Sequence, residues 1–317
     1  MTAAAPVPAR PALAQPGPAG PAAEGVREKV PWVDAPRSQQ AVSVALTMLC
    51  GILLTLLVNL TSVSQLQHVA SQHHLYDQLR LSLAQGSTPV APITKSGKVV
   101  PLGTPVAVMT APEIGLAHEV VVEGSGSAQT MAGIGHRRDT VLPCQVGSSV
   151  LMARSAGYGG VGAAWSRLQN GDRFTVTMGQ GSCTYQVVGE RTAGDHAPQP
   201  PTGRGGALTL VTATGYPYAP TGVLRIDTAL VSDSFDAPGV VFPAGSLPAA
   251  EEPMGVDYTQ TLPLLIFGEI LVGLAIGAVW LWRTWGRAPA FIVITPLALA
   301  ALFLTARYID LMLPNLI

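Results

Sequence analysis

Residues 173–179 (RFTVTMG) and 183–189 (CTYQVVG) are two short runs rich in β-branched and aromatic residues, separated by a glycine-containing break. In the first run, Phe174 and Val176 alternate with polar neighbours, which is typical of a strand with one buried face. Five similar runs lie elsewhere between residues 104 and 236, namely PVAVM, HEVVVEG, SSVLMA, ALTLVTA and VLRIDTALV. Short strands at this spacing, with few helical stretches between them, predict one β-barrel or sandwich of roughly 130 residues.

The whole chain of 317 residues is 48% hydrophobic and only 12% charged, whereas about a quarter of the residues of a typical soluble domain are charged. This composition argues against an ordinary soluble enzyme. The net charge of -1 provides no basic surface for nucleic acid, so nucleic acid is not an expected partner. His68, His73 and His74 lie close together, but no Asp, Glu or Cys completes a set of metal ligands. We therefore interpret them as part of a solvated helix, and expect no metal and no cofactor.

Three apolar segments predict membrane-spanning helices. The first, within residues 39–61, contains a near-continuous apolar run of the length that crosses the hydrocarbon core. Residues 261–282, interrupted only by Glu269, and residues 288–310, which contain Pro296, predict two more spans. No small-residue cleavage site closely follows the first segment, so we expect it to remain as an anchor in the lipid bilayer.

Basic residues near these segments predict the topology. The positive-inside rule places in the cytoplasm the residues before the first span and the short hairpin between the second and third; their basic residues are Arg27, Lys29, Arg37, Arg283 and Arg287. The sequence therefore predicts a multi-pass protein of the cell membrane with a cytoplasmic N-terminus. The segment that contains the β-rich domain is expected outside the cell.

The remaining segments have the composition of tails and linkers. Residues 1–38 are rich in Pro and Ala and predict a disordered cytoplasmic tail. Residues 62–103 predict a helical stalk followed by a linker, residues 104–236 the β-rich domain, and residues 237–260 a second linker. The sequence does not indicate an oligomeric state.

Two of the three cysteines fall in the predicted external segment. Because an even pair in an oxidising compartment favours pairing, Cys144 and Cys183 predict one disulfide. Cys50 lies within the first span, as an apolar filler or an acylation site. An alternative makes Cys144 a reactive thiol with His136 as its base. A structural role is favoured for His136, since a loop histidine needs a positioned nucleophile before it indicates catalysis.

The β-rich region also resembles a known family. In chain order, the segments GIGHRRDTVLPCQVG, SSVLMARSAGYGG, WSRLQNGDRFTV, TYQVVGER, LTLVTATG and VLRIDTALV resemble those of sortases, nearest to the membrane-anchored housekeeping type of Gram-positive bacteria. The resemblance implies an eight-stranded β-barrel outside the membrane, in addition to the three helices. It also implies a cysteine transpeptidase, in which a thiolate attacks the Thr-Gly carbonyl of an LPXTG-like sorting signal.

The three catalytic positions of that family are altered in this chain. The nucleophilic cysteine ends a T-L-x-T-C string, and here Ala213 follows Thr209-Leu210-Val211-Thr212. Arg154 stands at the histidine position, where its guanidinium cannot act as a general base. The family's arginine aligns with Val223, and Arg225 lies two residues further along.

These departures favour a non-catalytic, sortase-like protein that binds a peptide or a cell-envelope protein. Arg154, Thr212, Thr214 and Arg225 are the candidate groove residues, although the two threonines alternate with Ala213 and so should point to the opposite face of the strand. One alternative is an active transpeptidase or hydrolase with a non-standard nucleophile. Another is a membrane scaffold in which the barrel is a spacer.

One charge pair is predicted within the membrane. An unpaired carboxylate inside a span is costly, and Glu269 and Arg307 would lie at similar depths in an antiparallel helical hairpin. We hypothesise that they pair, with a protonated Glu269 or a carboxylate that faces a partner subunit as the alternatives.

Overall fold

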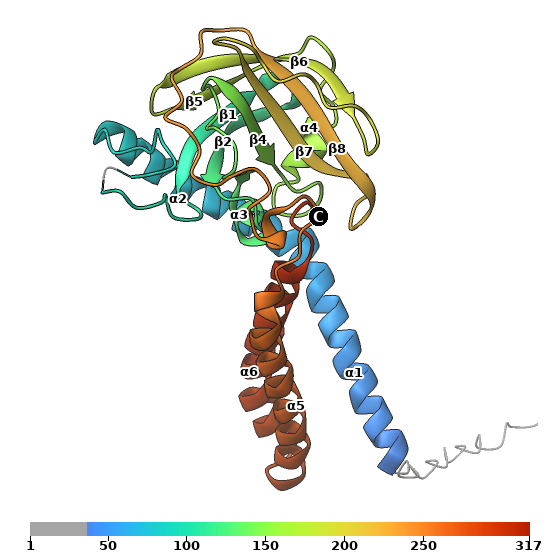
Figure 1. Cartoon of the computed structure of the whole chain (residues 1–317). Coiled ribbons are helices and arrows are strands. Elements are labelled where there is room, and N and C mark those ends of the chain that lie inside the picture. Colours follow the sequence, from blue (N-terminus) through green and yellow to red (C-terminus); the bar gives the residue numbers. More distant parts are fainter. Residues whose placement is uncertain (1–36, 95) are drawn as a thin grey trace, which may run out of the picture. The chain divides into compact units, whose positions relative to one another are not determined.

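The computed structural model describes residues 37–94 and 96–317, whose central feature is a closed β-barrel (Figure 1). Eight strands close it in the order β1-β2-β3-β4-β7-β8-β6-β5. They are β1 (Pro105–Ala111), β2 (Leu116–Glu123), β3 (Ile134–His136), β4 (Gly147–Met152), β5 (Arg173–Met178), β6 (Gly181–Arg191), β7 (Gly206–Tyr216) and β8 (Ala219–Leu230). The predicted eight-stranded barrel is thus confirmed, and the open choice between barrel and sandwich is resolved.

The barrel interior is filled by alternate residues of its strands. In β5, Phe174, Val176 and Met178 are buried while the residues between them are exposed, as the sequence pattern predicts. The ring of Phe174 stacks on Tyr185 of β6, with 5.6 Å between the centroids. Most neighbouring strands are antiparallel, but β2–β3 and β4–β7 are parallel.

Long helices precede and follow the barrel. They are α1 (Arg37–Val58), the π-helical turn η1 (Asn59–Val63), α2 (Ser64–Ala84), α5 (Thr261–Thr284) and α6 (Arg287–Met312). Three helical stretches are long and apolar enough to cross a membrane, namely 45–84, 258–284 and 288–312. Apart from Arg37 and Ser38, which begin α1, the predicted disordered tail lies outside the described residues.

Two short helices complete the barrel region. They are α3 (Ser127–Ala132) and α4 (Val161–Trp165). Three single 3₁₀ turns lie nearby: η2 (Pro112–Ile114), η3 (Ala249–Glu251) and η4 (Tyr258–Gln260).

Helix α2 packs on the outer face of the barrel. Leu75 and Leu79 are buried in one apolar cluster with Val108, Val120 and Val122 of β1 and β2. His68 is also buried, and its Nε2 lies 2.8 Å from Oε1 of Glu119. The interpretation of His68 as part of a solvated helix face is therefore wrong, because the sequence pattern of α2 did not show which face meets the barrel.

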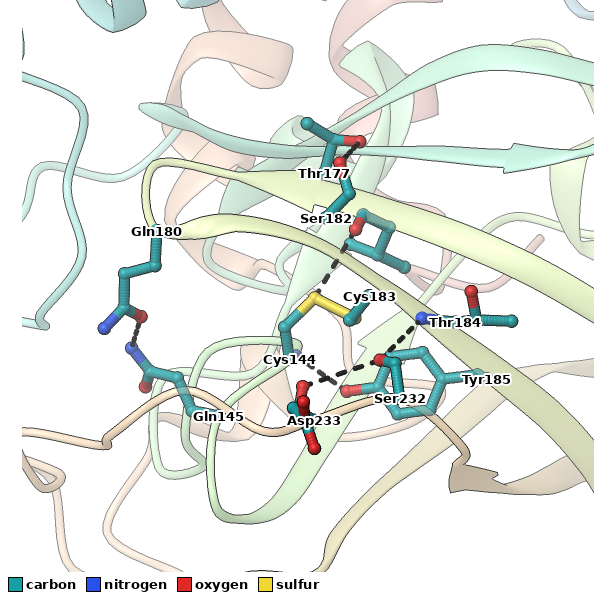
Figure 2. Close-up of a disulfide and its surroundings, with 11 residues drawn as sticks. Cys144, Gln145, Thr177, Gln180, Ser182, Cys183, Thr184, Tyr185, Ser232 and Asp233 are labelled. Carbon is teal, nitrogen blue, oxygen red and sulfur yellow. Dashed lines mark hydrogen bonds between the residues drawn. A yellow bond between two sulfur atoms is a disulfide. The ribbon is translucent and has the colours of Figure 1, made fainter.

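The predicted disulfide is confirmed. Cys144 and Cys183 are bonded, with 5.7 Å between their Cα atoms, and the bond joins the loop after β3 to β6 (Figure 2). The Cys144 main-chain N–H donates to the Tyr185 hydroxyl at 2.7 Å, and Gln145 donates to Gln180 at 2.8 Å (Figure 2). Because its sulfur is bonded, Cys144 is not a free nucleophile, and that alternative is wrong.

Ion pairs fasten the segment after the barrel to the loop after β3. Arg137 contacts Asp139 and Glu252, each at 2.7 Å, and Arg138 pairs with Glu251. Residues 251–252 are therefore held against the barrel by two arginines.

Candidate functional site

Ala213 and Val223 lie together on the outer face of β7 and β8, and Met152 of β4 packs in the same cluster. Leu208 and Leu210 of β7 point into the barrel core, so Val211 and Ala213 point outward. Ala213 lies directly opposite Val223 in the β7–β8 register. In the parallel β4–β7 pair, Met152 lies beside Val211. Arg154 follows Met152 by two residues and donates to the carbonyl oxygen of Ile317, the neighbour of Leu316, which packs on Ala213. We call the surface formed by Met152, Arg154, Val211, Ala213 and Val223 the cleft.

Arg154 is buried, and both of its terminal guanidinium nitrogens donate hydrogen bonds, while its Nε has no partner among the described residues. Its Nη2 donates to Oγ of Ser127 at 2.5 Å and to the carbonyl oxygen of Asp310 at 3.4 Å, and its Nη1 donates to the carbonyl oxygen of Ile317. Burial lowers the pKa of Arg154 to about 10, and the nearby Tyr158 and Asp310 oppose that shift. The guanidinium therefore stays charged at neutral pH, where it can bind an acceptor but cannot take a proton.

The cleft is covered by residues 313–317 of the same chain, a segment that sequence reasoning missed. Leu316 is completely buried and packs in one cluster with Met152, Val211 and Ala213. The Ser155 main-chain N–H and hydroxyl both donate to the Leu316 carbonyl oxygen, at 2.9 and 3.1 Å. The Asn315 side-chain amide donates to the carbonyl oxygens of Ser125 and Glu252 at 2.8 and 2.9 Å. The segment is thus held by both main-chain and side-chain contacts.

Arg225 lies on the same outer face as Val223, two residues further along β8. It is paired in register with Val211 on one side and Arg191 on the other. Partial burial and the charge of Arg191 lower the pKa of Arg225, while Asp227 opposes the shift. The carboxylate of Asp227 is already bound, since Arg191 donates to it at 2.6 Å.

The two threonines named as groove candidates are not on the cleft side of β7. Thr212 is buried on the opposite face, where a Cβ added to Gly162 of α4 would lie only 1.9 Å from the Thr212 hydroxyl oxygen. Thr214 lies two residues further on, and is therefore on the same side as Thr212. Because side chains alternate along a strand, both threonines point away from the groove and from the side on which Ala213 lies.

His136 has a structural environment. Its ring is buried in β3, with Nδ1 2.9 Å from Oε2 of Glu123 and Nε2 3.0 Å from the carbonyl oxygen of Val141. Burial opposes protonation, but the charge and hydrogen bond of Glu123 outweigh it and raise the pKa of His136. No group of three or more His, Cys, Asp or Glu side chains in the described ranges is arranged to hold a metal ion.

A cluster of buried polar side chains joins the barrel region to α6 and to the turn between α1 and α2. The Asp310 carboxylate of α6 accepts hydrogen bonds from the Tyr158 hydroxyl at 2.6 Å and from the Asn59 side-chain amide. Asn59 belongs to the π-helical turn between α1 and α2. We call Asn59, Ser127, Arg154, Tyr158 and Asp310 the junction. Residues separated by up to 251 positions meet here, and no local pattern could have predicted them.

The hypothesised Glu269–Arg307 pair is not formed. Both side chains are exposed, and no ion pair within 4.0 Å joins them in the described part of the chain. Phe267 of α5 stacks on Tyr308 of α6, with 5.3 Å between the ring centroids. Glu269 lies two residues beyond Phe267, so it is turned by about 200° from the face that meets α6.

Comparison with known proteins gave structural likenesses alone, since no family model and no curated protein matches the chain. The sortase D5 transpeptidase of Clostridium perfringens is 17% identical, with a TM-score of 0.42 over 52% of this chain and 98% of that one. Sortase C1 of Streptococcus agalactiae is 20% identical, with a TM-score of 0.38 over 53% and 89%. Sortase E of Streptomyces avermitilis is 24% identical, with a TM-score of 0.35 over 42% and 91%.

This chain is similar in structure to sortases. All three TM-scores lie below 0.5.

Proposed function

We propose that this chain is a non-catalytic, sortase-like membrane protein, derived from the housekeeping type, whose barrel binds a peptide or cell-envelope partner. The observation that carries the proposal is the state of Arg154. At the position where the resemblance implies a catalytic histidine, a buried guanidinium donates to Ser127, Asp310 and Ile317 of its own chain. A group held in this way stabilises an arrangement of the chain and is not free for proton transfer.

The nucleophile position supports the same proposal. The Ala213 methyl group cannot form an acyl intermediate, and it is covered by Leu316. No thiol takes its place among the described residues, because Cys144 and Cys183 are bonded to each other and Cys50 lies in α1. These points disfavour the alternative of an active enzyme with a non-standard nucleophile.

The proposed location places the barrel outside the cell. A disulfide within the barrel fits an oxidising compartment. The basic residues before α1 and between α5 and α6 fit the cytoplasmic side. We retain the division into a tail, three spans, a stalk, a barrel and a linker, with the N-terminus in the cytoplasm.

The test is incubation of the full chain, purified in detergent, with an LPXTG-type peptide and a triglycine amine, followed by mass spectrometry. We expect neither a covalent adduct nor a cleaved peptide, while an active sortase run in parallel gives both. An adduct or a transpeptidation product from this chain would contradict the proposal. Deleting residues 104–236 while keeping the spans tests the scaffold alternative, which requires the deletion to retain full cellular activity.

A further inference from the structure

We propose that the cleft is a binding site for a short peptide of the type Leu-Pro-Asn-Leu-Ile, bound as a turn in which the Ile317 main-chain N–H donates to the Pro314 carbonyl oxygen at 3.0 Å. Residues 313–317 of the chain occupy it as an intramolecular ligand, which a partner peptide has to displace. This inference rests on the proposed function and deepens it, because it names the class of peptide and the group that controls access to the cleft. It is carried by four features of the contact.

The first feature is an apolar pocket that fits one side chain. Leu316 lies between Met152 of β4 and Val211 and Ala213 of β7, and Val223 of β8 packs against the same cluster. A methyl group at position 213 leaves room that a larger side chain would fill. An aliphatic residue is therefore preferred at this position of the bound peptide.

The second feature is recognition of the main chain. Two donors of Ser155 converge on the Leu316 carbonyl oxygen, and Arg154 donates to the next carbonyl, that of Ile317. The Asn315 main-chain N–H in turn donates to the Gly255 carbonyl oxygen at 3.0 Å. Contacts to main-chain atoms do not depend on the side chains of the peptide, so the pockets for those side chains provide selectivity.

The third feature is selectivity for asparagine. The Asn315 side-chain amide donates to the carbonyl oxygens of Ser125, Ala250 and Glu252, which come from two separate parts of the chain. An aspartate lacks these donors and would place its charge beside three carbonyl oxygens. The cleft therefore selects a peptide in which asparagine is followed by leucine.

The fourth feature is the way the segment leaves α6. Leu313 has extended backbone angles, with φ -66° and ψ 147°, and the proline that follows disfavours a helical residue before it. The helix therefore ends here, and residues 314–317 form the turn that lies in the cleft.

The main test measures binding of a fluorescent Leu-Pro-Asn-Leu-Ile peptide to the full chain in detergent. The variant Leu316→Lys places a charge in an apolar pocket beside Arg154, so its segment should leave the cleft. We expect this variant to bind the peptide at least about tenfold more tightly than the wild type, whose cleft is already filled. Val188→Lys, at an exposed position of β6, is the matched control and should behave as the wild type.

A scrambled peptide of the same composition should not bind the Leu316→Lys variant. Equal affinity of Leu316→Lys and wild type, or equal binding of the scrambled peptide, would overturn the proposal. Either result would leave the non-catalytic assignment intact, because that assignment fails only if an LPXTG-type peptide is cleaved or attached.

A second test does not depend on dislodging the segment. With Cys50→Ser as background, Ala213→Cys and Leu316→Cys together should form a disulfide under mild oxidation, identified by mass spectrometry after proteolysis. Thr175→Cys with Leu316→Cys is the control pair and should remain unlinked, because Thr175 is exposed on β5. Excess Leu-Pro-Asn-Leu-Ile peptide should lower the yield of the first link. A yield unchanged by the peptide would show that the segment is not a displaceable ligand.

Discussion

At the residue scale, Arg154 connects three separate parts of the chain. A histidine ring could not reach Ser127, Asp310 and Ile317 together, whereas the forked guanidinium contacts all three. The arginine thereby binds the chain to itself, and under the proposed function it does so at the position of a catalytic histidine. The small side chain of Ala213 is complementary, because it admits Leu316.

We predict that Arg154→His destabilises the protein and does not give it any transpeptidase activity. The change leaves the Ile317 carbonyl and the Ser127 hydroxyl without their charged donor, and one hydrogen bond to a charged group contributes about 1.5–3 kcal/mol. Thermal unfolding of the full chain in detergent measures the loss. Arg173→His, at an exposed position of β5, is the control and should change the free energy of unfolding by less than about 0.5 kcal/mol. Equal stability of Arg154→His and wild type would contradict this role.

We also predict a pH dependence that arises from His136. Its pKa is raised in the folded state because Glu123 binds the protonated ring, so the folded state holds this proton more tightly than the unfolded chain. The stabilisation is therefore fully present below the unfolded pKa of about 6.5 and is lost as the pH rises through the folded pKa. Unfolding midpoints recorded across this range should fall with rising pH, and His136→Gln should flatten the slope. An unchanged slope in the variant would assign the effect to other groups.

At the element scale, local patterns predicted the strands and long helices, but not how they pair. The alternation in β5 shows which residues face the core, and three apolar runs indicate the long helices. The parallel β4–β7 pairing, which sets Met152 beside Val211, joins strands more than fifty positions apart and leaves no local signal. The covering of the cleft was missed for the same reason, since residues 313–317 lack the charge, glycine or motif that marks a site.

The disulfide gives a prediction at this scale. Replacing Cys144 and Cys183 with alanine opens a loop with a sequence separation of 39, and in the chain-entropy model closing such a loop stabilises by about 4 kcal/mol. We expect a lower thermal midpoint for the double variant. We also expect the main-chain amides of the loop after β3 to lose their protection from hydrogen exchange. Cys50→Ser is the matched control and should retain the midpoint of the wild type, since Cys50 is free and exposed. A midpoint equal to that of the wild type would show that the ladder of β5 and β6 holds this region without the bond.

At the scale of the whole molecule, the junction and the cleft belong to one arrangement. Arg154 contacts Ser127 of α3 and the carbonyl oxygen of Asp310 in α6, and it also holds Ile317 in the cleft. Asp310 in turn binds Tyr158 from the barrel and Asn59 from the turn between α1 and α2. A change at the junction is therefore expected to alter the residues that cover the cleft.

Asp310→Ala tests this connection. The variant removes the acceptor of two buried donors, the Tyr158 hydroxyl and the Asn59 amide, while the closed sheet of the barrel keeps all of its own hydrogen bonds. Hydrogen–deuterium exchange of the full chain in lipid nanodiscs should become faster at residues 59–64, 155–160 and 313–317 and stay unchanged in β5 and β6, because local opening depends on local contacts. Asp233→Ala, at an exposed position after β8, should leave all of these rates unchanged. Faster exchange around residues 59–64 with residues 313–317 still protected would show that the cleft is covered independently of the junction, since Arg154 would then be sufficient to hold the segment.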